Sequence, residues 1–277
     1  MTTMTVRNAP ARPVGAMLRE WRERRRLSQL DLSIQADIST RHLSFVETGR
    51  SKPTPEMILR LTEQLEVPLR ERNSLLLAGG YAPAYPEHGF DEPQLTAVRA
   101  ALRQVLAGHE PFPAVVVNRW WELVDANRSL GLFTTGVAAF LLEPPVNVLR
   151  LSLHPEGVAP RIANLSQWRV HLLERLQQQI AATGDAVLQS LHDELEAYPA
   201  PAVSHDAPVI DTALSAVAVP FQVVMPSGVL SFLSTITIFG TPVDVTLQEL
   251  AVESFFPADE QTAAALAALA AQQQQAG

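Results

Sequence analysis

The chain of 277 residues contains no cysteine, so it forms neither a disulfide framework nor a metal site built on thiolates. It also shows no hydrophobic run that would span a bilayer, and the nearly uncharged apolar run Gly131–Leu142 is too short to do so. The first residues show no charged segment followed by an apolar one, as a secretory signal would. We therefore expect a cytoplasmic protein that uses no membrane, disulfide or metal.

Lysine is nearly absent, since Lys52 is the only one in the chain. The formal net charge of −8 is unevenly distributed. Residues 1–52 carry 10 Arg and Lys against 5 Asp and Glu, whereas residues 91–277 carry 8 against 19. A basic head on an acidic body is typical of a protein that holds nucleic-acid phosphates at one end only. Arginine would supply most of these contacts.

The common catalytic motifs are also missing. The sequence contains no Gly-x-Ser-x-Gly, no His-Glu-x-x-His and no Gly-x-x-x-x-Gly-Lys. His154 and His192 are far apart, and the acidic residues after His192 fit a solvated helix face. We therefore expect no enzyme, no catalytic residue and no cofactor.

Start and stop signals predict five helices between Val14 and Ala78. The first runs over Val14–Arg26, with Leu18 and Trp21 facing inward. The second and third begin after the hydroxyl residues Ser28 and Ser39, which can cap a first turn. Thr54-Pro55 caps the fourth helix, and the fifth opens at Pro68 and stops at Gly79-Gly80.

The second and third helices are predicted to form a helix-turn-helix within residues 28–53. Their apolar contacts would come from Leu30, Leu32, Ile34, Ala36 and Ile38, with Leu43 and Val46 facing inward on the third helix. The opposite face of the third helix carries Thr40, Arg41, Ser44 and Phe45. A short helix with such a face has the right size for a DNA major groove.

This segment resembles the Xre/Cro/C1 repressor family, whose pattern is Ser-Gln, Leu, Ala, a turn, Ser and Glu-x-Gly. The matching residues are Ser28-Gln29, Leu32, Ala36, Ser39 and Glu47-x-Gly49. Asp37 stands where the family usually has Gly, and Asp tolerates a left-handed backbone better than most residues. The resemblance implies that double-stranded DNA is the partner. It also implies an ion pair between Arg22 and Glu47 that ties the first helix to the third.

The same resemblance assigns DNA contacts by position. Thr40, Arg41 and Phe45 would reach base edges, and Arg41 could bind guanine in bidentate fashion. Phe45 could equally be core, and His42 could serve packing or capping. The remaining positions lie at helix starts and in the loop after the third helix, where phosphate contacts occur. The predicted DNA-binding residues are Gln29, Ser39, Thr40, Arg41, Phe45, Thr48, Arg50 and Lys52.

Residues 81–93 are rich in proline and are predicted to be a linker, after which the sequence pattern changes from helices alone to a mixture of helices and strands. Helices are predicted over Leu95–Leu106, Trp168–Thr183 and Ala186–Ala197, and a short helical stretch over Asp125–Leu142. Strands are predicted over Ala114–Val117, Trp120–Val124, Val146–Leu153, Ala216–Met225, Val229–Phe239 and Thr246–Phe255. This order predicts an α+β protein, an all-α head of five helices followed by an antiparallel sheet with flanking helices.

Several motifs together resemble the MmyB-like transcription regulators, and the hairpin before Asp125-Ala126-Asn127 resembles the opening of a PAS domain. The motifs are Arg41–Phe45 with Glu47-x-Gly49-Arg50-Ser51, Pro68–Asn73, Gly80–Pro83, Phe239–Thr246 and Phe255–Asp259. The resemblance implies an Xre-type head over 1–80, a PAS-like ligand-binding domain over 94–262 and an Ala/Gln-rich tail over 263–277. It further implies a small apolar ligand of the fatty-acid type.

Candidate ligand residues follow from the apolar body and its few polar groups. The predicted lining is Trp121, Phe133, Phe140, Phe221, Val223, Phe232 and Ile236, with Arg150, Arg161 and Asn164 as partners for an acidic head group. The alternative is that these aromatic residues only fill a core. We expect a transcription regulator that binds DNA as a homodimer and responds to the ligand. The alternative is a regulator without a ligand, whose PAS-like domain serves dimerisation or binds a partner protein.

Overall fold

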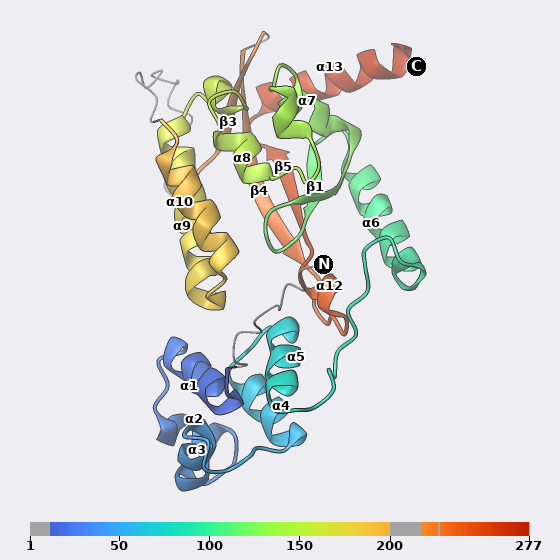
Figure 1. The fold of residues 1–277 in the computed structure, drawn as a ribbon. Helices are drawn as coiled ribbons and strands as arrows, with labels where there is room; N and C mark the ends of the chain where they lie inside the picture. The colour runs from blue at the N-terminus through green and yellow to red at the C-terminus, as the bar shows by residue number, and fades with distance from the viewer. Residues whose placement is uncertain (1–11, 200–217, 227, 277) are drawn as a thin grey trace, which may run out of the picture. The chain divides into compact units, whose positions relative to one another are not determined.

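The computed structural model describes residues 12–199, 218–226 and 228–276. The chain divides into two compact units, which we call the head and the body. The head comprises residues 1–88 together with 242–248, and the body comprises 89–241 and 249–277. The chain therefore passes between the units at three places, after residues 88, 241 and 248. Figure 1 shows the helices of the head and the sheet of the body.

The head contains the five predicted helices, α1 to α5. Their bounds are Val14–Arg24 for α1, Gln29–Gln35 for α2, Thr40–Glu47 for α3, Pro55–Gln64 for α4 and Leu69–Ala78 for α5. The predicted capping residues Ser28, Ser39 and Thr54 each accept a hydrogen bond from a backbone N–H of the first turn. Asp37 has a φ of 51°, so it does take the left-handed conformation that the turn requires.

Each of the five helices contributes at least one buried residue to the core of the head. Leu18 and Trp21 of α1 and Leu43 and Val46 of α3 are buried, as predicted. Leu32 and Ala36 are the buried apolar contacts of the α2–turn segment, whereas Leu30 and Ile34 are 57% and 70% exposed. The prediction that Leu30 and Ile34 press the two helices together is therefore wrong, because α2 is short enough to bury only one narrow stripe.

Glycine allows α1 and α3 to approach closely. A Cβ atom on Gly15 would lie 2.1 Å from the carbonyl oxygen of Val46. No side chain fits at that position without moving the helices apart, because the contact is with backbone rather than with a flexible side chain. This close approach fixes where α3 sits within the head.

Residues 84–88, within the predicted linker, are held by hydrogen bonds within the head. Asn73 on α5 accepts from the backbone N–H groups of Ala84 and Tyr85 and donates to the Tyr85 carbonyl. The segment 242–248, which includes the short helix α12 (Val245–Gln248), also packs here. Gln248 accepts from the Leu69 N–H at 2.7 Å, and His88 lies 2.7 Å from Asp244. Residues 84–88 are therefore tied to the head rather than spanning a gap.

The body contains a five-stranded antiparallel sheet with the strand order β2-β1-β5-β4-β3. The strands are β1 (Ala114–Val117), β2 (Leu123–Ala126), β3 (Phe221–Met225), β4 (Gly228–Ile238) and β5 (Ala251–Pro257). The consecutive pairing of β3, β4 and β5 confirms the predicted meander. One face of the sheet contributes Val115, Phe221, Phe232 and Phe255 to the main core.

Helices cover the sheet and complete the α+β fold. The bounds are Thr96–His109 for α6, Gly131–Thr134 for α7, Val148–Leu153 for α8, Leu165–Thr183 for α9, Ala186–Ala197 for α10 and Glu260–Ala276 for α13. Short 3-10 turns lie at Pro93–Leu95, Arg128–Leu130, Ala139–Leu142 and Ala159–Arg161. Helices α9 and α10 lie side by side in Figure 1, and α9 places Trp168, Leu172 and Leu176 in the core with the sheet.

Three strand predictions in the body are wrong in place or type. Within the predicted strand Val146–Leu153, residues Val148–Leu153 form helix α8, because the Asn147 side chain accepts from the N–H groups of Leu149 and Arg150 and so caps a helix. The predicted strand Thr246–Phe255 begins with α12, capped by Asp244, and only Ala251–Pro257 is strand. The second strand lies at Leu123–Ala126 rather than Trp120–Val124. Residues 216 and 217 of another predicted strand lie outside the described residues.

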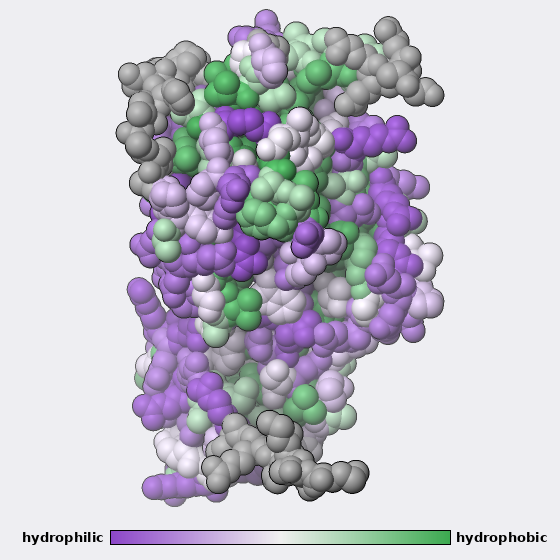
Figure 2. Space-filling view, turned by 45° about the horizontal axis from the view of Figure 1, so that its top comes forward, coloured by the Kyte–Doolittle hydropathy of each residue, from purple (hydrophilic) through white to green (hydrophobic). Residues whose placement is uncertain are grey.

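Three further observations concern the surface and the described residues. On the face shown in Figure 2, hydrophobic side chains lie in patches between hydrophilic ones. Within the described part of the chain, no helix is both long enough and apolar enough to cross a bilayer. The same residues hold no cluster of three or more His, Asp or Glu side chains that could bind a metal ion.

Candidate nucleic-acid interface and ligand cavity

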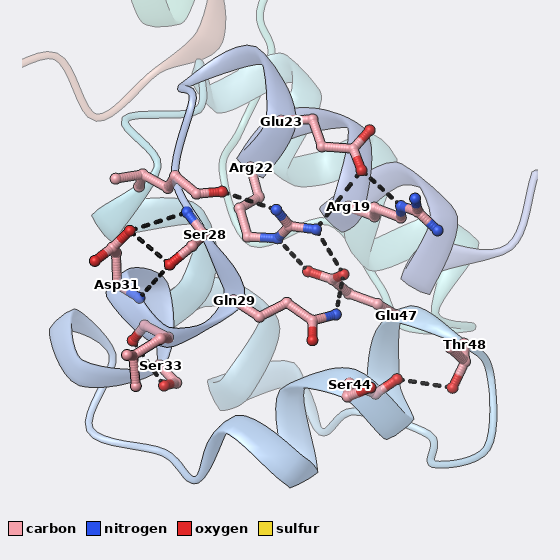
Figure 3. Close-up of polar contacts among 12 residues, drawn as sticks. Arg19, Arg22, Glu23, Ser28, Gln29, Asp31, Ser33, Ser44, Glu47 and Thr48 are labelled. Atoms are coloured by element: carbon pink, nitrogen blue, oxygen red, sulfur yellow. Dashed lines mark hydrogen bonds and ion pairs between the residues drawn. The ribbon is translucent and has the colours of Figure 1, made fainter.

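The start of α2 is fixed by a reciprocal capping box, which Figure 3 shows. Ser28 Oγ accepts from the Asp31 N–H at 3.1 Å, and the Asp31 carboxylate accepts from the Ser28 N–H at 3.0 Å. The Ser28 hydroxyl also donates to the Asp31 carboxylate at 2.6 Å, and this hydrogen bond, followed by that from the Ser28 N–H, holds the pKa of Asp31 below its usual value. The first helix of the helix-turn-helix therefore begins at a defined residue.

A buried ion pair joins α1 to the end of α3, as the repressor resemblance implied. Arg22 Nε and Nη2 donate to the two carboxylate oxygens of Glu47 at 2.7 and 2.9 Å (Figure 3). The two side chains are 9% and 1% exposed, and Arg22 Nη1 also donates to the Leu27 carbonyl. The hydrogen bonds to Glu47 raise the pKa of Arg22, although burial acts in the opposite direction. The pair holds α3 against α1 with both charges compensated.

Some of the predicted DNA-binding side chains make hydrogen bonds within the head. Gln29 donates its amide to Glu47 at 2.8 Å, and Thr40 shares a 2.8 Å hydrogen bond with Ser33. Thr48 donates to the Ser44 carbonyl, and Ser39 accepts from the His42 N–H as the cap of α3. These four side chains stabilise the helix-turn-helix, and each can still make further hydrogen bonds to a ligand or DNA.

The exposed face of α3 presents positive charge around one aromatic ring. The guanidinium groups of Arg41 and Arg50 lie 5.3 and 5.9 Å from the half-buried ring of Phe45. Arg50 and Lys52 lie in the loop between α3 and α4, and Lys52 Nζ is 4.9 Å from the ring of Tyr81. Among the described residues, these three cations make no ion pair with a carboxylate. They are therefore available to a phosphate or a base edge.

The body contains a small apolar cavity between the sheet and the helices. Its volume is about 50 Å³, which holds a few water molecules or a small group rather than a whole lipid. The lining is mostly apolar, with Arg175 and Glu253 as the charged members. The lining residues are Val115, Leu130, Phe133, Val148, Leu149, Leu151, Ser152, Val158, Trp168, Leu172, Arg175, Phe221, Glu253 and Phe255.

A second, larger cavity lies beside the first. Its volume is about 460 Å³, and Leu132, Arg161, Met225, Leu266 and Leu269 are among its lining residues. The segment Ser129–Thr135 borders both cavities, since Leu130 and Phe133 line the small one and Leu132 and Thr135 the large one. Arg161 donates to the Phe133 carbonyl, and burial lowers the pKa of Arg161.

The structure distributes the predicted ligand residues over several places. Phe133 and Phe221 line the small cavity, and Arg161 lines the large one. Trp121, Val223 and Phe232 are buried in the surrounding core. Phe140 and Ile236 are 51% and 40% exposed and line neither cavity.

Two of the three polar residues predicted to bind the ligand, Arg150 and Asn164, make hydrogen bonds with other groups of the protein. Arg150 makes hydrogen bonds with the Glu194 carboxylate from Nε and Nη2, which raise the pKa of Arg150. Asn164 donates to the Pro220 carbonyl and accepts from the Gln222 N–H, so it positions β3. Sequence reasoning missed Arg175, because one arginine on an amphipathic helix gives no sign that it faces a cavity.

The fold and these sites define a class of protein, a helix-turn-helix DNA-binding transcription regulator with a ligand-binding domain. A sequence model described as helix-turn-helix domain matches residues 13–75. The model of the MmyB-like transcription regulator ligand binding domain matches residues 98–269, which is more than half of the chain. The chain belongs to this MmyB-like family.

A curated relative agrees with this assignment. It is described as an uncharacterized HTH-type transcriptional regulator, RghRB, from Bacillus subtilis (strain 168). The two proteins are 37% identical over 114 residues, which cover 40% of this chain and 80% of the relative.

Proposed function

We propose that this protein is a sequence-specific, homodimeric transcription regulator of the cytoplasm whose body binds a small apolar molecule of the fatty-acid type. The observation that carries the DNA-binding part is the exposed face of α3. Arg41 on this face and Arg50 in the loop after α3 flank Phe45 without a carboxylate partner among the described residues. The buried Arg22–Glu47 pair supports the proposal, since it holds that helix rigidly against α1.

In this account α3 enters the major groove and its exposed side chains read base edges. Arg41 donates in bidentate fashion to guanine, and Thr40 and Phe45 contact neighbouring bases. Arg50, Lys52, Gln29, Thr48 and Ser39 contact phosphate and set the register of the helix. A single short helix covers few base pairs, so two heads on a two-fold operator are needed for useful specificity.

The variant Arg41→Ala is expected to lose about 1–3 kcal/mol of operator binding, concentrated at one base position of each half-site. The reason is that the guanidinium specifies a base, whereas a phosphate contact would not. The measurement is operator affinity for a set of duplexes that differ at single positions. The matched control is Arg60→Ala, an exposed arginine on α4, which should bind every duplex as the wild type does. Equal weakening on all duplexes would refute base reading by Arg41.

The ligand part of the proposal is supported by the apolar cavity and by the family to which the body belongs. The cavity of about 50 Å³ has to widen to admit a lipid chain. The segment Ser129–Thr135 separates it from the larger cavity of about 460 Å³. A shift of this segment would join the two spaces into a volume typical of small-molecule sites.

Ligand binding is expected to raise the stability of the body. At a ligand concentration a hundredfold above the dissociation constant, the gain is about 2.7 kcal/mol. The measurements are native mass spectrometry of the purified protein and thermal unfolding of delipidated protein with decanoate or decanamide. Val148→Phe, which places a ring in the small cavity, should lose the effect, whereas Phe140→Leu at the exposed position should keep it. A native mass equal to that of the chain without any bound lipid, together with no shift in the unfolding temperature with either compound, would contradict the ligand proposal.

The chain connectivity offers a route from ligand to DNA. Strand β5 carries Glu253 and Phe255, which line the small cavity, and it follows directly on residues 242–248 of the head. Gln248 in turn accepts from the first N–H of α5. A ligand that changes the packing of β5 would thereby bias the head. Operator affinity that is the same with and without ligand would favour the alternative, a body that serves only dimerisation or a partner protein.

A further inference from the structure

Arg175 on α9 has two hydrogen-bond donors without a partner among the described residues. Its Nη1 donates to Glu253 Oε1 on β5 at 3.0 Å. Its Nε and Nη2 are both buried, and neither has an acceptor. Buried donors in proteins are nearly always satisfied, so each exception calls for a missing acceptor. That acceptor is either water or part of a ligand.

The guanidinium group is held in place beside the small cavity. It lies 4.3 Å from the ring centroid of Trp121, and the Trp121 indole N–H donates to Gln179 at 2.8 Å. Arg175 and Glu253 both line the cavity of about 50 Å³. One water needs about 10–15 Å³ by the same kind of measure, so the cavity also admits a small polar group with its first carbon atoms. The two free donors are therefore preorganised for an oxygen acceptor.

The charge at this place is already balanced. Glu253 is 5% exposed and neutralises Arg175, whose side chain is 19% exposed. Burial, followed by the charge of Arg175, lowers the pKa of the nearby His171, so that histidine supplies no second positive charge. A carboxylate added here would leave a negative charge uncompensated in apolar surroundings, which is costly. An uncharged carbonyl oxygen would use both donors without that cost.

We propose that Arg175 is the specificity-determining anchor of the ligand site and that it selects a chain with an uncharged oxygen acceptor at its end, such as an amide, ester or aldehyde. Glu253 acts as the positioning residue, because it fixes Arg175 and cancels its charge. This inference rests on the proposed function, namely that the body binds a small apolar molecule with a chain of the fatty-acid type, and it narrows that molecule to a neutral derivative rather than the free carboxylate. It adds that the polar end of that molecule carries no charge in the bound state.

The test compares decanamide with decanoate, binding to the full-length protein, by calorimetry at mildly alkaline pH. The wild type should bind the amide about tenfold or more tightly than the carboxylate, because Glu253 already balances Arg175 and the carboxylate would bring an uncompensated charge into the site. Glu253→Gln removes the compensating charge and should reverse the preference towards decanoate by a similar factor. The double variant Arg175→Met with Glu253→Gln removes both charges without leaving one unpaired. In it decanamide should bind about tenfold more weakly than to the wild type, because its two donors are gone, and decanoate should stay weak, because no cation compensates its charge.

The matched control is Arg169→Met, on the same helix, whose guanidinium donates to the carbonyls of Tyr198 and Glu196 away from the cavity. It should keep the wild-type ratio of affinities. A double variant that binds both probes as the wild type does would overturn the inference, since water alone would then occupy the two donors. A wild type that prefers decanoate would also overturn it. Binding of neither probe would instead remove the proposed ligand function, and the inference with it.

Discussion

Glu47→Ala should destabilise the head by about 3–5 kcal/mol and abolish operator binding. The substitution leaves the buried Arg22 Nε and Nη2 without their acceptors and takes away the partner of the Gln29 amide. Arg22, which is 9% exposed, would then keep only the exposed Glu23 at 3.7 Å as an ionic partner, so the head relaxes by moving α3 away from α1. DNA binding is then lost although Glu47 itself faces inward.

The measurement is hydrogen exchange of residues 12–88 in urea, which reports on the head separately from the body. The matched control is Glu23→Ala, because Glu23 is an exposed carboxylate that pairs with Arg19 at 2.7 Å and lies 3.7 Å from Arg22 itself. That variant should change stability by about 1 kcal/mol or less. Replacing Arg22 and Glu47 together by methionine should recover most of the loss. A Glu47→Ala head as stable as that of Glu23→Ala would contradict this account of the ion pair.

Phe133→Ala should destabilise the body by about 3–5 kcal/mol. The Phe133 ring makes edge contacts with Phe221, Phe232 and Phe255, at centroid distances of 5.1, 5.3 and 5.3 Å. These three rings come from three strands, so Phe133 joins the segment after β2 to the centre of the sheet. Alanine would remove all three contacts and enlarge a cavity that already exists.

Urea unfolding followed by tryptophan fluorescence measures this effect, because Trp168 contacts Phe221 in the same core. Phe140→Ala is the matched control, since the Phe140 ring is half-exposed and contacts only His154 among the aromatic residues described. Its effect should stay within about 1 kcal/mol. If the two variants were equally stable, Phe133 would not be a central core residue.

The sequence predicted the head well because its signals are local. Capping residues such as Ser28, Ser39 and Thr54 act within three residues of their partners, so they can be read from the chain alone. The left-handed Asp37 and the α10 bounds were predicted on the same grounds. The exposure of Leu30 and Ile34 was not predicted, since the apolar spacing of a short helix does not tell which of its residues contacts a neighbouring helix.

The body was harder because its signals depend on distant residues. The apolar run at 146–153 fits a strand or a buried helix equally well, and only the Asn147 cap decides for helix α8. Glu253 is 78 residues away from Arg175, so their pairing leaves no local trace. The sequence placed Asn127 directly after the PAS-like hairpin, but its hydrogen bonds to the backbone of Leu106, Phe112 and Ala114 depend on the folded structure.

The most direct test of the central claim, that the exposed face of α3 reads DNA, is selection of duplexes from a random pool by the full-length protein. The wild type should enrich one motif with two-fold symmetry. A variant in which Arg41 and Phe45 are both alanine should fold with the same helix content and enrich no motif, or one that is degenerate at the positions these residues read. Enrichment of the unchanged motif by that variant would contradict the claim.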